Sequence, residues 1–300
     1  MSISKSITNG RNPTYLDPRY EIRQLTVAHI PWAVAIVIHS NMFHSPVWTV
    51  LYPDEKTKRV QQGMGAADYL IRHQIESGMS FGIFDTQYDY KRPGSALTQG
   101  KLYWDPNDVK SDGASLLQQM DFPLVSVALS YDASNPLDMQ RLMHLVEVLP
   151  AFGTLYGALE SLDGRDPASW KARGLHEVLM RNGTATRPDY EGRGLTRKMA
   201  DWLMREAAGQ GYRGIQIETA HDAVTHTWLH PPKPFQAELI VKLDMATYEQ
   251  ENEEGKRVRP FEPSKQVCTK IYVTLKGSHD GQSGVNGHAT QVNGHVGAFG

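Results

Sequence analysis

A short glycine-rich stretch at the start of a predicted helix carries the clearest chemistry in this sequence. Residues 190–197 read YEGRGLTR. The first backbone N–H groups of a helix lack partners inside the helix and face the positive end of its dipole, so they attract anions. Gly192 and Gly194 have no Cβ and let a phosphate approach, while Arg193 and Arg197 can add charged hydrogen bonds. A phosphate site and a plain glycine turn with surface arginines explain these letters about equally well.

Two other phosphate-binding signatures do not fit the same stretch. A dinucleotide fingerprint needs a third glycine where Arg197 stands. A P-loop needs Gly-Lys followed by Ser or Thr, and the sequence lacks that run. We therefore disfavour nucleotide binding of either kind.

Apolar periodicity predicts the elements that must position this stretch. Leu195, Met199, Trp202 and Leu203 lie on one face of a helix over about 192–208, which the glycines after it would end. The same patterns predict strands at 20–25, 80–84, 124–131, 175–186, 215–219, 237–243 and 267–275. They predict further helices at 28–43, at 54–76 and after Pro136, and Pro150 should break or kink the last of these. Residues 85–121 read as an irregular excursion that could help shape a pocket.

Composition and charge bound the class of protein. The sequence has 31 basic and 33 acidic residues, so it lacks the field that would attract nucleic acid or an anionic membrane. Cys268 is the single cysteine, which excludes an intrachain disulfide and favours a reducing compartment. We expect a cytoplasmic protein with one domain over 20–276, a disordered N-terminus over 1–19 and a disordered Gly-, Asn- and His-rich tail over 277–300.

Three nearby histidines invite a metal interpretation. His226 and His230 are one helical turn apart, and His221 precedes them. A zinc site needs further ligands or a His-Glu-x-x-His pattern, which this stretch lacks. We assign no metal.

The glycine stretch and its approach resemble the GNAT superfamily of acyl-CoA-dependent N-acyltransferases. The signature of that family is Gln or Arg, two residues, Gly, one residue, and Gly or Ala at a helix start; Glu191, Gly194 and Thr196 fill these positions. The resemblance implies an α/β (α+β) fold with a mixed, mostly antiparallel central sheet flanked by helices, with an inserted helical segment. It also implies acetyl-CoA as co-substrate.

The resemblance further implies how the cofactor is held. The backbone of Ala185, Thr186 and Arg187 would pair with the pantetheine arm as a strand would, and the amides of residues 192–196 (Gly192, Arg193, Gly194, Leu195 and Thr196) would hold the pyrophosphate. Glu191 departs from the family pattern, because its carboxylate would repel phosphate unless it points away or pairs with Arg187 or Arg193. Thr196 is bulkier than the usual residue, although its hydroxyl could donate to a phosphate oxygen.

Family enzymes transfer the acyl group directly, and a tyrosine often protonates the departing thiolate. Trp228 stands at that tyrosine's position here, so water, His226 or a tyrosine from elsewhere such as Tyr272 would have to serve. For the general base we expect Glu177 or Glu218, since a carboxylate at a partly buried strand end can have its pKa raised toward working pH. Pairing with arginine or exposure to solvent remains the alternative for each.

The expected function is transfer of an acyl group, in the simplest case acetyl, to a small-molecule amine. The departures at Glu191, Thr196 and Trp228 leave open a protein that binds CoA without transferring acyl groups, or a biosynthetic enzyme of different chemistry. Acetylation of a protein amine has less support, since no acidic peptide-binding run is visible. We expect a monomer or homodimer.

Overall fold

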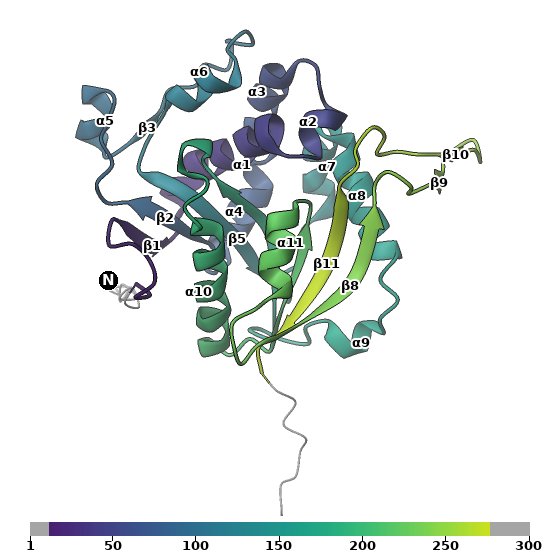
Figure 1. Cartoon of the computed structure of the whole chain (residues 1–300). Coiled ribbons are helices and arrows are strands. Elements are labelled where there is room, and N and C mark those ends of the chain that lie inside the picture. The colour runs from purple at the N-terminus through teal and green to yellow at the C-terminus, as the bar shows by residue number, and fades with distance from the viewer. Residues whose placement is uncertain (1–11, 277–300) are drawn as a thin grey trace, which may run out of the picture.

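One mixed sheet organises the molecule, seen in a computed structural model whose described residues are 12–276 (Figure 1). Its seven strands run in the order β1-β2-β5-β6-β7-β11-β8. The bounds are β1 Tyr20–Gln24, β2 Phe81–Asp85, β5 Leu124–Asp132, β6 Val178–Thr186, β7 Gly214–Thr219, β8 Gln236–Asp244 and β11 Val267–Thr274. Strands β6 and β7 are parallel and the other neighbours are antiparallel. The predicted mostly antiparallel sheet is confirmed.

Helices cover both faces of this sheet. The longer helices are α1 Ile30–His44, α3 Lys56–Ala66, α4 Asp68–Glu76, α7 Met139–Val148, α8 Pro150–Ser161, α10 Leu195–Gly209 and α11 Asp222–Leu229. The shorter elements are α2 Trp48–Leu51, α5 Pro93–Thr98, α6 Gly113–Gln118, α9 Pro167–Trp170, β3 Lys101–Leu102, β4 Met120–Asp121, β9 Gln250–Glu251 and β10 Arg257–Val258. The hairpin of β9 and β10 projects away from the body of the fold in Figure 1.

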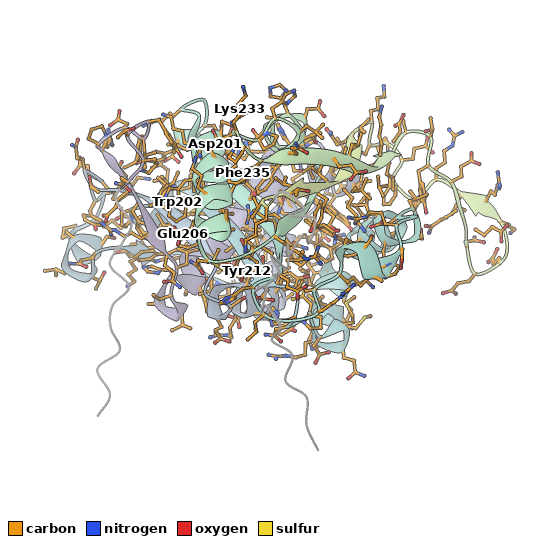
Figure 2. The ribbon with its side chains drawn as sticks, turned by 90° about the horizontal axis from the view of Figure 1, so that it is seen from below. Asp201, Trp202, Glu206, Tyr212, Lys233 and Phe235 are labelled. Atoms are coloured by element: carbon orange, nitrogen blue, oxygen red, sulfur yellow. The ribbon has the colours of Figure 1, made fainter. Side chains whose placement is uncertain are left out.

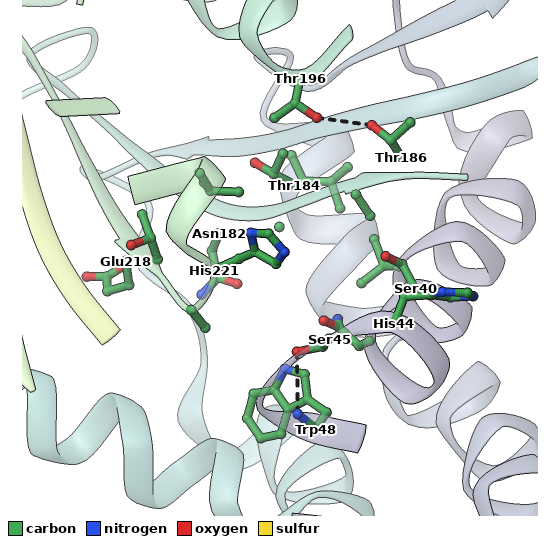
Figure 3. Close-up of a pocket in the computed structure, with 18 of the residues that line it drawn as sticks. Ser40, His44, Ser45, Trp48, Asn182, Thr184, Thr186, Thr196, Glu218 and His221 are labelled. Carbon is green, nitrogen blue, oxygen red and sulfur yellow. Dashed lines mark hydrogen bonds between the residues drawn. The ribbon is translucent and has the colours of Figure 1, made fainter. Parts of the chain in front are cut away.

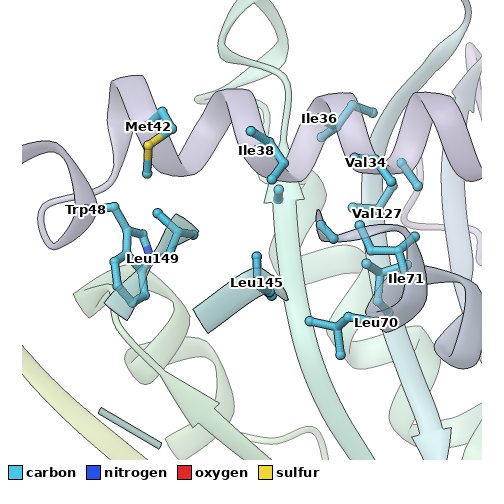
Figure 4. Packing of buried hydrophobic residues seen from close by; sticks show 14 of the residues in the cluster. Val34, Ile36, Ile38, Met42, Trp48, Leu70, Ile71, Val127, Leu145 and Leu149 are labelled. Atoms are coloured by element: carbon cyan, nitrogen blue, oxygen red, sulfur yellow. The ribbon is translucent and has the colours of Figure 1, made fainter. Parts of the chain in front are cut away.

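The core on one face packs α1, α4, α7 and α8 against the sheet (Figure 4). Val34 and Ile38 on α1 meet Ile71 on α4, Val127 on β5 and Leu145 on α7 in one buried cluster. Helix α1 is apolar on nearly all sides, as expected for a helix enclosed by other elements. This face therefore holds a rigid frame of four helices around β5 and β6.

The core on the other face is built by α10 and α11. Leu203 on α10 is buried together with Ile217 on β7 and Ile271 on β11. At the border of this core, Trp202 on α10, labelled in Figure 2, meets Phe81 on β2 edge-on with ring centroids 4.7 Å apart. The predicted amphipathic helix is confirmed, and it begins three residues later than expected, after Gly194.

Several predicted boundaries need correction. The helix expected over 54–76 is two helices, α3 and α4, which change direction at Ala67. Pro150 ends one helix and begins another: it occupies the first turn of α8, where its missing N–H removes no hydrogen bond. Part of the N-terminus expected to be disordered is packed, because Leu16 is buried and Asn12 bonds the backbone of Tyr20 and Ile22.

The remainder of the predicted terminal segments, residues 1–11 and 277–300, lies outside the described residues. Within 12–276, none of the helices combines the length and apolar character needed to cross a bilayer. The excursion over 85–121 contains α5, α6 and the small β3–β4 hairpin. Asp112 begins α6 by accepting a 2.7 Å hydrogen bond from the N–H of Ser115.

Candidate active site

A cavity of about 640 Å³ runs through the centre of the molecule (Figure 3). One end is lined by the glycine stretch and the first turn of α10, including Gly192, Gly194 and Arg197. The middle is lined by β6, β7 and the start of α11, and the far end by α1, α4, α7 and α8. Residues 85–121 contribute nothing to its wall, so the prediction that this excursion shapes the pocket is wrong for this cavity.

The middle of the cavity exists because β6 and β7 separate. Their parallel pairing ends at Arg181 and Ile217, whereas β6 stays paired with β5 as far as Thr186. The N–H of Arg187 bonds the carbonyl of Val125 on β5, so by strand alternation the backbone groups of Thr186 face the opposite side, toward the gap. An extended ligand can therefore pair with β6 there as an added strand would.

Of the three residues predicted for that pairing, two line the cavity. Ala185 and Thr186 belong to its wall, and Arg187 does not. The guanidinium of Arg187 is fully buried, pairs with Asp189 at 2.8 Å and donates to the carbonyl of Phe122 at 2.9 Å. Its backbone and side chain are both committed to structure, so Arg187 holds the loop in place.

The glycine stretch has the backbone that a phosphate cradle requires. Gly192 and Gly194 have φ values of 74° and 69°, which L side chains rarely adopt, and a Cβ at either would meet open space. Gly194 is the N-cap of the fifteen-residue helix α10, whose first N–H groups face the cavity end. The positive φ values explain the glycines, and the open space leaves room for an anion.

The predicted residues of this loop line the cavity, but their side chains differ in freedom. All of Glu191, Gly192, Arg193, Gly194, Leu195, Thr196 and Arg197 lie in the wall. Arg193 donates to the hydroxyl of Tyr20 at 2.7 Å, and Arg197 pairs with Asp201 at 2.9 Å. The two arginines are thus held beside the helix start, where they supply positive charge.

The two departures from the family signature find places in this loop. Glu191 is exposed, so its carboxylate can turn to solvent, away from the start of α10. The hydroxyl of Thr196 lies 3.1 Å from that of Thr186, which in turn lies 2.8 Å from that of Ser126 (Figure 3 shows the first contact). This chain of three hydroxyls ties the start of α10 to β6 and β5, which accounts for Thr196.

The far end of the cavity is a chamber with mainly apolar walls. Its side chains are those of Leu70, Ile71, Leu145, Leu149, Phe152, Leu155 and Trp48. Polar groups come from Ser40, His44 and Ser45 on the α1 side and from Asn182 on β6 (Figure 3), and α8 adds Tyr156. Among the described residues that line the whole cavity, the carboxylates are those of Glu191 and Glu218. The chamber therefore suits an uncharged, apolar group.

The two predicted bases are far apart. Glu218 lies in the cavity wall where β7 turns away from β6, and burial raises the pKa of its carboxyl to about 7. Glu177 precedes the nine-residue β6, so it lies about 30 Å from the loop end of that strand. It lines a separate surface hollow and faces Arg213 at 3.6 Å. The structure thus places Glu218, and not Glu177, where chemistry could occur.

The suggested proton donors are not in the cavity wall. His226 is exposed on the outer side of α11, with its ring against that of His230. The hydroxyl of Tyr272 lies 3.3 Å from Arg213, and Tyr272 is not among the residues of the cavity wall. Trp228 is 1% exposed and packs in the core beneath α11, so it does not take the place of the family's tyrosine. In α11, Val224 and Thr227 line the cavity instead.

Tyr156 and His221 are among the side chains with exchangeable protons that line the cavity. Tyr156 on α8 lies beside Asn182 and near Glu218, and burial raises the pKa of its hydroxyl above the usual range, so it stays protonated. His221 accepts the N–H of Ala223 on Nδ1 at 3.2 Å, which places the proton of the neutral ring on Nε2. Tyr156 was not predicted as a site residue, because no separate helix was expected where α8 lies.

Metal ligands do not gather around this site. Within the part of the chain that the structure describes, no group of three or more histidine, cysteine, aspartate or glutamate side chains could hold an ion. Nδ1 of His230 bonds the backbone carbonyl of His226 at 2.8 Å.

Comparison with known proteins shows the fold by structure alone. No protein-family model and no curated protein matches the sequence. Among solved structures, the C-terminal condensation domain of Ebony in complex with beta-alanyl-dopamine is 16% identical, with 84% of this chain and 97% of that chain covered and a TM-score of 0.57. Arylalkylamine N-acetyltransferase 2 from Aedes aegypti is 9% identical, with 86% and 99% covered and a TM-score of 0.52. The fold that the resemblance implied is confirmed.

Proposed function

We propose that this chain, which has the fold of the GNAT acetyltransferases, is an acyl-CoA-dependent N-acyltransferase acting on a small-molecule amine. The observation that carries the proposal is the continuity of the cavity. It joins an anion-binding helix start, an open strand edge, a buried carboxylate and an apolar chamber. Those four parts match, in order, the phosphates, the pantetheine arm, the reacting thioester and the acceptor.

The proposed cofactor is acetyl-CoA. The amides after Gly194 would receive the pyrophosphate, with positive charge from Arg193 and Arg197. The free edge of β6 at Thr186 would pair with the amide groups of the pantetheine arm. This arrangement directs the thioester down the gap between β6 and β7, toward Glu218.

In the proposed reaction, a neutral amine attacks the carbonyl carbon of the thioester. The new C–N bond forms, the C–S bond breaks, and the sulfur leaves as a thiolate. Glu218 takes the proton that the attacking nitrogen loses, because a carboxyl with a pKa of about 7 is half ionised near neutral pH. Tyr156 or His221 returns a proton to the thiolate, and each lies in the same cavity wall.

We further propose that the acceptor is a monoamine with an apolar body. A second cationic group would have to lie between Leu145, Leu149 and Phe152, and the carboxylates of the described cavity wall are those of Glu218, which serves as the base, and Glu191 in the glycine stretch. Burying an unpaired ammonium costs several kcal/mol, which an apolar wall does not offset. Catalytic efficiency with 2-phenylethylamine should therefore exceed that with agmatine by about 100-fold or more.

Calorimetric titration of the purified chain tests the cofactor assignment. Acetyl-CoA, CoA and desulfo-CoA should bind in the micromolar range and NAD should not. Release of CoA with 2-phenylethylamine as acceptor should follow, and a Gly194→Glu variant should bind none of the three CoA forms. Absence of CoA binding in a folded protein would refute the proposal.

A second candidate is condensation of an amine with a different acyl donor. It is favoured by the likeness to the condensation domain of Ebony, which has the higher TM-score of the two. The same chamber and the same base, Glu218, would serve, and the glycine stretch would bind another phosphate-bearing donor. Lack of CoA binding together with retained binding of 2-phenylethylamine would favour this candidate.

We retain the cytosol as the proposed compartment, because Cys268 is a free, buried thiol.

A further inference from the structure

The proposed base is connected to a chain of buried polar groups that the reaction itself does not use. Gln216 and Glu218 are two residues apart on β7 and so share one face of the sheet. Nε2 of Gln216 donates to Oε1 of Glu218 at 3.2 Å, and Gln216 is 1% exposed. The amide thus gives the carboxylate a hydrogen bond from inside the protein.

Arg165 determines which way that amide points. A guanidinium has donors only, so its 2.7 Å contact with Gln216 must be made to Oε1 of the amide. Nε2 is then left facing Glu218. Arg165 is itself held by Asp163 through two hydrogen bonds of 2.9 and 2.6 Å. The orientation of Gln216 is therefore imposed by a fixed ion pair.

Lys270 adds a fixed positive charge on the same face. It lies directly opposite Glu218 on the neighbouring strand β11 and is 1% exposed. Its ammonium contacts Glu160 at 2.9 Å and Asp163 at 3.2 Å. It is held by these two carboxylates and acts on Glu218 through its charge.

Further titratable groups face Glu218 from other elements. Tyr131 on β5 and Tyr156 on α8 lie close enough for the charge of Glu218 to raise the pKa of each hydroxyl, after burial, which is the larger cause. Both stay neutral at working pH. Glu160 on α8 opposes ionisation of Glu218 through its negative charge, and His221 lines the same cavity just beyond β7. Gln216 and Lys270 are the neighbours that favour the ionised carboxylate.

We propose that Gln216 and Lys270 are positioning residues for Glu218, held in place by Arg165, Asp163 and Glu160. This inference rests on the proposed function, in which Glu218 is the base. Burial alone would keep the carboxyl protonated in neutral solution, where it could not accept a proton. The amide and the ammonium offset part of that effect and leave the group ready to ionise at the pH where it must work.

The test is a direct titration of Glu218 by ¹³C NMR in the full chain labelled at glutamate Cδ. The Glu218 signal is assigned by its loss in Glu218→Gln. Gln216→Met and Lys270→Met should each move the titration midpoint upward by about one pH unit, the shift typical of losing one favourable partner. Lys270→Arg, which keeps the charge, should restore most of the midpoint. Lys242→Met, at an exposed position on β8, is the matched control and should move nothing.

Arg165→Met is the second variant, in case Gln216→Met or Lys270→Met does not fold, because the side chain of Arg165 is 18% exposed. It frees the amide of Gln216 and should move the midpoint in the same direction. An unchanged midpoint in a folded Arg165→Met or Gln216→Met protein would overturn the role of Gln216, and an unchanged midpoint in folded Lys270→Met would overturn that of Lys270.

The same variants are then assayed with acetyl-CoA and 2-phenylethylamine as probes, where the acidic limb of kcat/KM should follow the NMR midpoint. Since the NMR titration needs no turnover, it separates the two proposals. Shifted midpoints without any activity would count against the proposed function alone, whereas activity with unmoved midpoints would refute this inference alone.

Discussion

Replacing Glu218 with glutamine should remove activity and, above neutral pH, make the protein more stable. Burial raises the pKa of this carboxyl from 4.5 to about 7 in the folded chain. Protonation of Glu218 therefore favours the folded state. The contribution of the protonated carboxyl to the free energy of unfolding is complete below pH 4.5 and is lost as pH rises through 7. Above that pH, an ionised Glu218 must be kept in the cavity wall.

The difference of about 2.5 pKa units corresponds to about 3 kcal/mol, at 1.36 kcal/mol for each unit. Glutamine has nearly the same shape and carries no charge, so Glu218→Gln should gain this amount at pH 9 and little at pH 4. For a domain of this size, that gain corresponds to a rise in melting temperature of roughly 5–10 °C. The effect of all other titrating groups cancels when variant and parent are compared at the same pH.

Thermal unfolding of both proteins at pH 4 and pH 9 provides the measurement, with kcat/KM for acetyl-CoA and 2-phenylethylamine measured in parallel. Glu177→Gln is the control, because this carboxyl lies outside the cavity. We expect kcat/KM to fall by about 10²–10⁴ in Glu218→Gln, the usual contribution of a general base. Equal melting temperatures at pH 9 would show that the ionised carboxylate is not destabilised by burial, and an unchanged kcat/KM would show that Glu218 is not the base.

Three other predictions concern the rest of the cavity. Gly194→Glu should weaken CoA binding by more than 100-fold, because the new side chain enters open space and repels phosphate, while the strain of a side chain at a φ of 69° should cost about 1–2 kcal/mol of stability; unchanged affinity by calorimetry in the folded variant would place the cofactor elsewhere. Arg197→Met should weaken CoA binding about 10-fold and Lys198→Met should not, since Arg197 lines the cavity and Lys198 does not; equal losses would contradict the assignment. Trp48→Ala should raise KM for 2-phenylethylamine by about 10-fold while CoA affinity stays constant, and a matching loss for CoA would show that the chamber is not the acceptor site.

The sheet and the glycine stretch before α10 were predictable because their signals are local. The alternation in Val267, Thr269, Ile271 and Val273 identified β11, and the glycines before Leu195 identified the start of α10. Local patterns failed where a turn depends on packing. The break between α3 and α4 at Ala67 follows Gly63 and Gly65, two weak helix formers, and both helices pack against α1. Glycines at these positions are compatible with one continuous helix or with two, so packing decides.

The candidate site was only partly predictable, since it depends on which end of a strand faces the cavity. Glu177 and Glu218 look alike in sequence, each being a carboxylate next to an apolar run. Strands β6 and β7 are parallel, so the residue before the start of β6 and the residue near the end of β7 lie toward opposite ends of the two strands. That arrangement leaves Glu218 in the gap between β6 and β7, and Glu177 at the other end of these strands beside Arg213. No periodicity within either strand carries this information.

The same reasoning changes the meaning of Trp228. In the sequence it stands where the family has a proton donor, which suggested lost activity. In the structure its side chain turns into the core under α11, 5.7 Å from the guanidinium of Arg181, and so leaves the cavity. Tyr156 enters the cavity from α8, on the opposite face of the sheet. A proton donor can thus be supplied from another element, and the loss of the usual tyrosine does not by itself argue against catalysis.

Tyr156→Phe tests this point: we expect kcat to fall by about 10-fold or more with CoA affinity unchanged, and an unaltered kcat would leave His221 or water as the donor.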